Sequence, residues 1–128
     1  MKTFNNKIFI VDDEPLFSTM LSDYLIKQNP YLEVKSFMSG EACLESLFEN
    51  PDLIILDHYL NSNQSLNISG LEVLSEIKKT KTHPVVVMLS GQDSYYTAAK
   101  AIGLGALHYV IKDEEAFEKV GQIVKANI

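Results

Sequence analysis

The stretch that decides the fold is Leu53–Asp57, LIILD, in which four apolar residues run without a break and end in a carboxylate. Unbroken apolar runs of this length are typical of strands that are covered on both faces of a parallel sheet. Residues 32–37 instead alternate apolar with polar side chains, which indicates a less covered edge strand. The sequence predicts five strands in all, and the other three lie at 8–11, 85–89 and 109–111.

Amphipathic segments separate these strands and predict five helices, the first of which starts near Pro15 and ends at Asn29-Pro30. Their apolar stripes are Leu16, Phe17, Met20, Leu21, Tyr24 and Leu25; Ala42, Leu44, Leu47 and Phe48; Leu71, Val73, Leu74 and Ile77; Ala98, Ala99 and Ile102; and Phe117, Val120, Ile123 and Val124. Strict alternation of strand and helix favours right-handed crossovers with helices on both faces of the sheet. We therefore expect an α/β fold, a (βα)5 doubly wound parallel five-stranded sheet with the flavodoxin-like strand order 2-1-3-4-5.

The composition bounds the domain organisation and the class of partner. A chain of 128 residues, 46% hydrophobic, suits one domain over residues 1–128 with a core at about 7–127, and no apolar run approaches a membrane span. We expect a cytoplasmic protein without membrane insertion. The net charge is −6, and all eleven basic residues are Lys, which argues against direct nucleic-acid binding. The single cysteine, Cys43, excludes an intrachain disulfide and a thiolate metal cluster.

Polar side chains gather where the predicted strands end. In an open α/β sheet, ligands bind outside the carboxyl ends of the strands. The residues expected there are Asp12, Asp13 and Glu14 after the first strand, Asp57 at the end of the third, Ser90 after the fourth, and Lys112 after the fifth. Carboxylates ~4 Å apart repel by ~4 kcal/mol at an effective dielectric of 20, so a cation belongs among them, and oxygen ligands favour Mg²⁺. The set matches a phosphoryl-transfer site with a carboxylate nucleophile, a metal, an ammonium and a hydroxyl donor.

With these motifs the chain resembles the response-regulator receiver domains of bacterial two-component signalling, over roughly residues 7–127. The resemblance implies that Asp57 is the phosphoacceptor, that Ser90 and Tyr109 form the switch, and that Lys112 neutralises a phosphoryl oxygen. It also implies a Mg²⁺ ion whose ligands are Asp12, Asp13, Asp57 and the backbone carbonyl of Tyr59.

The resemblance also implies a function. A histidine kinase or phosphotransfer protein donates the phosphoryl group, and the modified domain changes the surface that it offers to a separate downstream protein. No output domain is expected in this chain, and the domain is expected to be a signalling switch and not an enzyme. Tyr59, two residues after the phosphoacceptor, is expected to cover the approach of the hydrolytic water, while Gln92 works in the opposite direction.

Two departures from the family pattern lie near the site. Asn61 stands where the family usually has proline, and Gly70 comes late, so the segment from His58 to Ser69 is about five residues longer than usual. Asp113 follows Lys112 in place of proline, and the Lys112-Asp113 peptide bond is therefore expected to be trans.

Two other functions are weighed against this one. A haloacid-dehalogenase-type phosphatase would use Asp12 as its nucleophile, but that family has an aspartate two positions later, where this chain has Glu14. A receiver fold that acts as an interaction module without phosphorylation is the other alternative.

His58 is expected to have no chemical role, because neighbouring residues of a strand point to opposite faces.

Overall fold

The computed structural model of the chain describes residues 6–60, 69–91 and 95–128. The elements, in chain order, are β1 (Lys7–Val11), α1 (Pro15–Gln28), β2 (Glu33–Phe37), α2 (Gly40–Glu45), a 3-10 turn (Leu47–Glu49), β3 (Leu53–Asp57), α3 (Gly70–Lys79), β4 (Val85–Ser90), α4 (Tyr95–Gly103), β5 (His108–Ile111) and α5 (Ala116–Asn127). The five strands form one parallel sheet in the order β2-β1-β3-β4-β5. The predicted fold class and strand order are confirmed.

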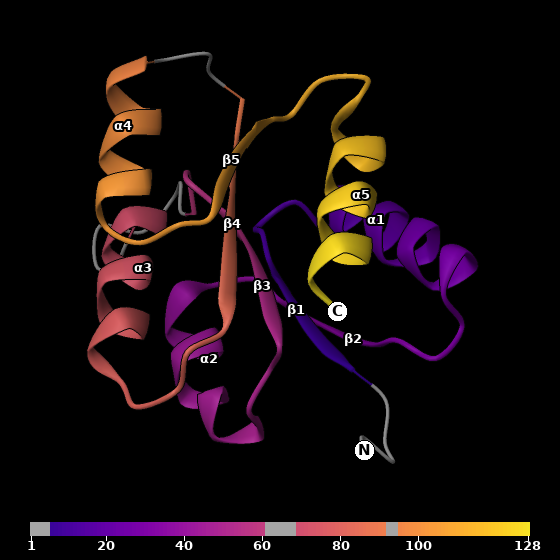
Figure 1. The fold of residues 1–128 in the computed structure, drawn as a ribbon, viewed down its shortest axis with the longest axis horizontal. Coiled ribbons are helices and arrows are strands. Elements are labelled where there is room, and N and C mark those ends of the chain that lie inside the picture. Colours follow the sequence, from indigo (N-terminus) through magenta and orange to yellow (C-terminus); the bar gives the residue numbers. More distant parts are fainter. Residues whose placement is uncertain (1–5, 61–68, 92–94) are drawn as a thin grey trace.

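Helices cover both faces of the sheet, with α1 and α5 on one side and α2, α3 and α4 on the other (Figure 1). Successive side chains of a strand point to opposite faces, so each central strand contributes to two hydrophobic layers. Ile10 packs in the layer of Leu21 and Val120, whereas Phe9 packs in the layer of Val73. Strand β3 is buried along its whole length, which explains why its sequence is apolar without alternation.

The predicted apolar stripe of α1 is wrong at two positions. Leu16 and Met20 are exposed, whereas Ser18, Leu21 and Leu25 are buried. Successive helical residues are turned by about 100°, so Leu16 and Met20 lie on the side of the helix opposite to these three.

Two further stripes are corrected in the same way. Helix α2 ends at Glu45, and a 3-10 turn follows, so Phe48 leaves the α-helical register and its side chain is exposed. In α4 the buried residue is Ala101, while Ala99 and Ile102 are exposed. Short helices with small apolar residues give a weak periodic signal, and packing against the sheet decides which face is buried.

The long segment predicted between His58 and Ser69 lies largely outside the described residues. Its described ends are close together, because the backbone N–H of Gly70 donates a hydrogen bond of 3.0 Å to the carbonyl of His58. Gly105, just after α4, has a φ of 111°, which glycine adopts without strain and which is typical of a residue that ends a helix. Among the described helices, none is long and apolar enough to cross a bilayer.

Candidate functional site

The carboxyl ends of four neighbouring strands bring the predicted site residues to one edge of the sheet. Asp12 directly follows β1, and its backbone N–H donates to the carbonyl of Phe37 at 3.0 Å. Asp57 ends β3, Ser90 ends β4, and Lys112 directly follows β5, with its backbone N–H donating to the carbonyl of Ser90 at 2.8 Å. Parallel pairing therefore places these four residues together, as predicted from the sequence.

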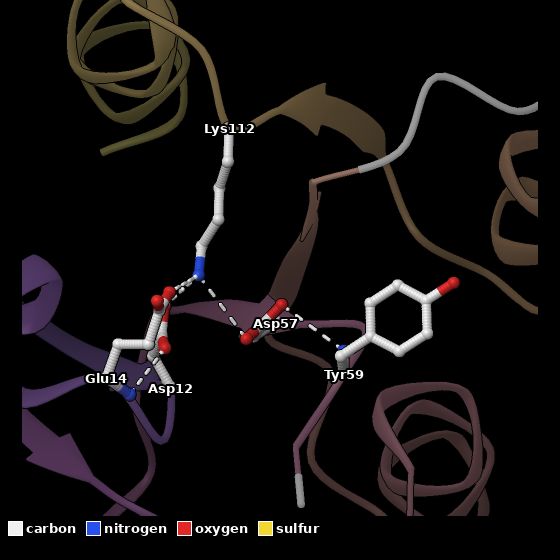
Figure 2. A network of polar contacts seen from close by, with 5 residues as sticks. All are labelled: Asp12, Glu14, Asp57, Tyr59 and Lys112. Atoms are coloured by element: carbon white, nitrogen blue, oxygen red, sulfur yellow. Dashed lines mark hydrogen bonds and ion pairs between the residues drawn. The ribbon is translucent and has the colours of Figure 1, made fainter. Parts of the chain in front are cut away.

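The ammonium of Lys112 lies among three carboxylates (Figure 2). Its Nζ atom is 2.6 Å from Oε1 of Glu14, 2.8 Å from Oδ2 of Asp12 and 3.4 Å from Oδ2 of Asp57. The same atom lies 4.5 Å from the ring centroid of Phe17, which adds a cation–π contact. Lys112 is therefore in reach of the Asp57 carboxylate, as the resemblance implies.

Sequence reasoning placed Glu14 at this edge of the sheet but gave it no partner. Its backbone N–H donates to Oδ1 of Asp12 at 2.9 Å, and its carbonyl accepts from Ser18 at 3.1 Å. These two bonds fix the turn between β1 and α1 and direct the Glu14 side chain towards Lys112. The run of three acidic residues at 12–14 was the available signal, but a sequence does not show which of them faces a lysine 98 residues away.

Burial and mutual repulsion perturb the carboxyl groups. Burial, and next the Asp12 carboxylate, raise the pKa of Asp57 to about 7, although Lys112 works in the opposite direction. Burial also raises the pKa of Asp12 above its ordinary value. Burial alone would lower the pKa of Lys112, but hydrogen bonds to Asp12 and Glu14 raise it above the ordinary value, so this ammonium stays charged. The site therefore holds more negative charge than Lys112 can balance.

Three carboxylates form a cluster that could hold a metal ion. Asp12, Asp13 and Asp57 each offer an oxygen, and these oxygens lie within 4.8 Å of one another. Beside them is an open cavity of about 310 Å³ lined by Asp13, Glu14, Asp57, Tyr59, Gly91 and Lys112. A larger groove, of about 680 Å³ between α1 and α5, lies away from these residues and contains none of them. The chemistry of the carboxylates therefore points to the smaller cavity.

Three of the remaining predicted residues, Ser90, Tyr109 and Tyr59, lie in the described part of the chain. Ser90 is fully buried, and Tyr109 is partly buried against the core layer of α2, α3 and α4. The Tyr59 backbone N–H donates to Oδ1 of Asp57 at 3.2 Å, and its half-exposed ring lies on the side of Asp57 away from Lys112 (Figure 2). Gln92 and Asn61 lie outside the described residues.

His58 is not among the residues that line the cavity. Its ring packs edge-to-face on Tyr59 with the centroids 4.4 Å apart, and its backbone N–H donates to the carbonyl of Leu89 at 2.8 Å. Burial lowers the pKa of His58, so its imidazole is neutral over a wider pH range. The hydrogen bond from the His58 backbone to Leu89 holds the end of β3 against β4.

Comparison with known proteins decides the family. The sequence profile of the response regulator receiver domain matches residues 8–124. The chain belongs to this family. The receiver domain is 31% identical over 108 residues to the alkaline phosphatase synthesis transcriptional regulatory protein PhoP of Bacillus subtilis, with 84% of this chain and 42% of that protein covered. It is 34% identical over 117 residues to the sensory transduction protein LytT of Bacillus anthracis, with 85% of this chain and 43% of that protein covered.

Solved structures agree with this assignment. The receiver domain of NtrX from Brucella abortus superposes with a TM-score of 0.81 at 27% identity, covering 94% of this chain and 96% of that one. The signal receiver domain of a putative LuxO repressor protein from Vibrio parahaemolyticus shares the fold, with a TM-score of 0.84 at 22% identity. The match covers 97% of this chain and 90% of that one. The chain spans less than half the length of the curated relatives that it matches.

The structure shows what Gly70 and Asp113, one residue from each departure, do in the fold. A Cβ atom on Gly70 would lie 2.2 Å from the carbonyl oxygen of Asp57, so the late glycine lets α3 approach the end of β3 in this receiver domain. The Lys112-Asp113 peptide bond is trans, as predicted. Asp113 accepts a hydrogen bond of 2.9 Å from the backbone N–H of Glu115 and another, of 3.1 Å, from Ala116, so it forms the turn that begins α5.

Proposed function

We propose that this receiver domain accepts a phosphoryl group on Asp57 from the phosphohistidine of a histidine kinase or phosphotransfer protein. The surroundings of Asp57 carry the proposal: the residue is buried, lines the cavity, and lies beside Asp12, Asp13 and the Lys112 ammonium. A receiver domain of DrrB, 28% identical with a TM-score of 0.81 and coverage of 96% and 97%, is described as BeF3-activated. That description supports the proposal because beryllium fluoride has the shape and charge of a phosphoryl group.

Mg²⁺ is the metal that we propose for the acidic cluster. Its oxygen donors and its excess negative charge fit a hard divalent cation, and the cavity leaves room for water ligands. Asp13 would bind the ion directly, Asp12 partly through water, and Asp57 and the Tyr59 carbonyl would complete the protein ligands. When bound, the ion would screen the charge that develops on the phosphoryl oxygens.

In the proposed step, an Oδ atom of Asp57 attacks phosphorus in line with the P–N bond of phosphohistidine. The P–O bond forms as the P–N bond breaks, and the electron pair returns to the imidazole nitrogen, which then takes up a proton. Lys112 contacts one phosphoryl oxygen and Ser90 donates a hydrogen bond to another. The raised pKa of Asp57 means that a cation beside the carboxylate would favour its ionised, nucleophilic form.

The switch would act through β4 and β5, which are neighbours in the sheet. Met88 pairs with Tyr109, and Ser90 pairs with Ile111, so the side chains of Ser90 and Tyr109 point to the same face. Movement of Ser90 towards the phosphoryl group would open space for the Tyr109 ring. The change would alter the surface of α4, β5 and α5, which we propose as the surface read by a separate downstream protein. Residues 1–128 would act as one such switch, in the cytoplasm.

Intact-mass spectrometry after incubation with Mg²⁺ and acetyl phosphate tests this function. The wild type is expected to gain one phosphoryl group, and Asp57→Asn is expected to gain none while keeping its circular dichroism spectrum. Asp52→Asn makes the same chemical change at the opposite end of β3 and serves as the control. A wild type that stays unmodified under these conditions would favour the alternative of an interaction module without phosphorylation.

A further inference from the structure

We propose that Glu14 is a positioning residue that holds Lys112 back from the phosphoryl position in the unmodified protein, so that phosphorylation exchanges one ion pair for another. The shortest contact of the Lys112 ammonium is to Glu14, at 2.6 Å, and its longest contact to a carboxylate is the 3.4 Å contact to Asp57. The inference rests on the proposed phosphoryl transfer to Asp57 and adds a residue that sets its rate.

The number of donors on the ammonium limits what Lys112 can bind. A lysine ammonium has three N–H groups, and three carboxylates, those of Asp12, Glu14 and Asp57, already surround it. A phosphoryl group on Asp57 adds acceptor oxygens beside the same ammonium. Phosphorylation removes the charge of Asp57 itself, so the phosphoryl oxygens replace its carboxylate as acceptors. The ammonium has to move towards these oxygens, and this movement lengthens its contact with Glu14 or with Asp12.

The contact with Glu14 is the easiest to give up. The side chain of Glu14 is 64% exposed, whereas those of Asp12 and Asp57 are 0% and 5% exposed. An exposed carboxylate that loses its partner is solvated by water, but a buried one keeps its full desolvation cost. Lys112 is therefore expected to leave Glu14 and to keep its contact with the buried Asp12.

Glu14 is also well placed to return Lys112 after hydrolysis. Its backbone is fixed by the hydrogen bond to Asp12 and by the first turn of α1, and the backbone of Lys112 is fixed by Ser90. The two side chains thus bridge the turn after β1 and the turn after β5 from anchored positions. Both residues line the cavity, where an incoming phosphoryl donor would meet them.

The test compares rates of Mg²⁺-dependent labelling for the wild type, Glu14→Gln and Glu76→Gln. Glu76 lies on α3, is half-exposed and pairs with Lys79 at 3.0 Å. Glu76→Gln therefore removes the same charge as Glu14→Gln, but from an ion pair away from the site. Glu14→Gln is expected to be labelled about twofold to fivefold faster, the effect typical of an exposed ion pair, and Glu76→Gln at the wild-type rate. The acceleration should shrink in high salt.

Two small donors separate this effect from simple repulsion of the donor by Glu14. Acetyl phosphate and phosphoramidate differ in net charge, because phosphoramidate carries a protonated amino group. Release of Lys112 should accelerate labelling by both donors by the same factor. Acceleration confined to acetyl phosphate, an unchanged or lower rate, or equal effects in Glu14→Gln and Glu76→Gln would overturn the proposal.

A second readout does not depend on phosphorylation. In the NMR spectrum of the metal-free protein, the ammonium resonance of Lys112 is expected to shift in Glu14→Gln and to stay in place in Glu76→Gln. No shift in Glu14→Gln would contradict the role of Glu14 even if the rates changed. If the Lys112 resonance shifts in Glu14→Gln but the wild type is never labelled at Asp57, the proposed function is refuted and the role of Glu14 is not. The two failures are therefore distinguishable.

Discussion

Replacement of Asp57 by asparagine is expected to stabilise the metal-free protein in a pH-dependent manner. Asp57→Asn keeps the size of the side chain and removes the charge that is buried beside Asp12. Lys112 keeps its contacts with Asp12 and Glu14 in the variant, so its ammonium is not left unpaired. The variant therefore isolates the cost of ionising one carboxyl group at the end of β3.

The structure sets the size and the sign of the effect. A pKa of about 7 in place of 3.8 corresponds to at most roughly 4 kcal/mol, at about 1.4 kcal/mol for each pH unit. The pKa of Asp57 is raised in the folded state. The wild type is therefore most stable below the unfolded pKa, where the group is protonated in both states, and loses stability as the pH rises through the folded pKa. The free energy of unfolding of Asp57→Asn should exceed that of the wild type by an amount that grows between pH ~4 and pH ~7 and stays constant above pH ~7.

Urea unfolding in the presence of a chelator, at several pH values from ~5 to ~8, measures this difference. Asp23→Asn makes the same chemical change at an exposed position of α1, away from the acidic cluster, and is the matched control against which the gain is read. A gain of about 1–4 kcal/mol for Asp57→Asn at pH ~8, shrinking towards pH ~5, is the expected result. If Asp57→Asn is as stable as wild type at every pH, or less stable at pH ~8, the account of a strained acidic cluster is wrong.

Three other perturbations test neighbouring residues. Mg²⁺ should raise the melting temperature of the wild type by mass action, and Asp13→Ala should remove most of this rise; an undiminished rise would reject Asp13 as a ligand. Tyr59→Ala should lose its phosphoryl group several-fold faster than wild type at saturating Mg²⁺, because the ring no longer excludes water, and an unchanged or slower rate would show that Tyr59 is no shield. Gly70→Ala should lower the free energy of unfolding by about 1–3 kcal/mol, since its Cβ would meet the Asp57 carbonyl; wild-type stability in urea unfolding would mean that α3 moves away without cost.

The sequence was most informative where one physical rule dominates. The buried strand β3 and the positions of Asp12, Asp57 and Lys112 follow from apolar runs and from the rule that parallel strands end at one edge of the sheet. The trans bond before Asp113 follows from the high cost of cis peptide bonds outside proline.

The sequence was least informative where side chains compete for partners. Leu16 and Met20 fit an apolar stripe, and only packing against the sheet shows that α1 buries its other side. Glu14 could not be paired with Lys112 from the sequence, because the pairing depends on the bend between β1 and α1 and on the exit of the chain from β5. The chemical roles of Ser90, Tyr109 and the Tyr59 carbonyl stay predictions.

The central claim is that Asp57 itself becomes an aspartyl phosphate. Borohydride reduces an acyl phosphate to an alcohol, so treatment of the protein after labelling with Mg²⁺ and acetyl phosphate turns the modified aspartate into homoserine. Peptide mass spectrometry then identifies the residue. The account predicts homoserine at position 57 in the wild type and none without Mg²⁺. Homoserine at position 12 would contradict it and favour the phosphatase mechanism, and homoserine at neither position would contradict phosphoryl transfer to this receiver domain.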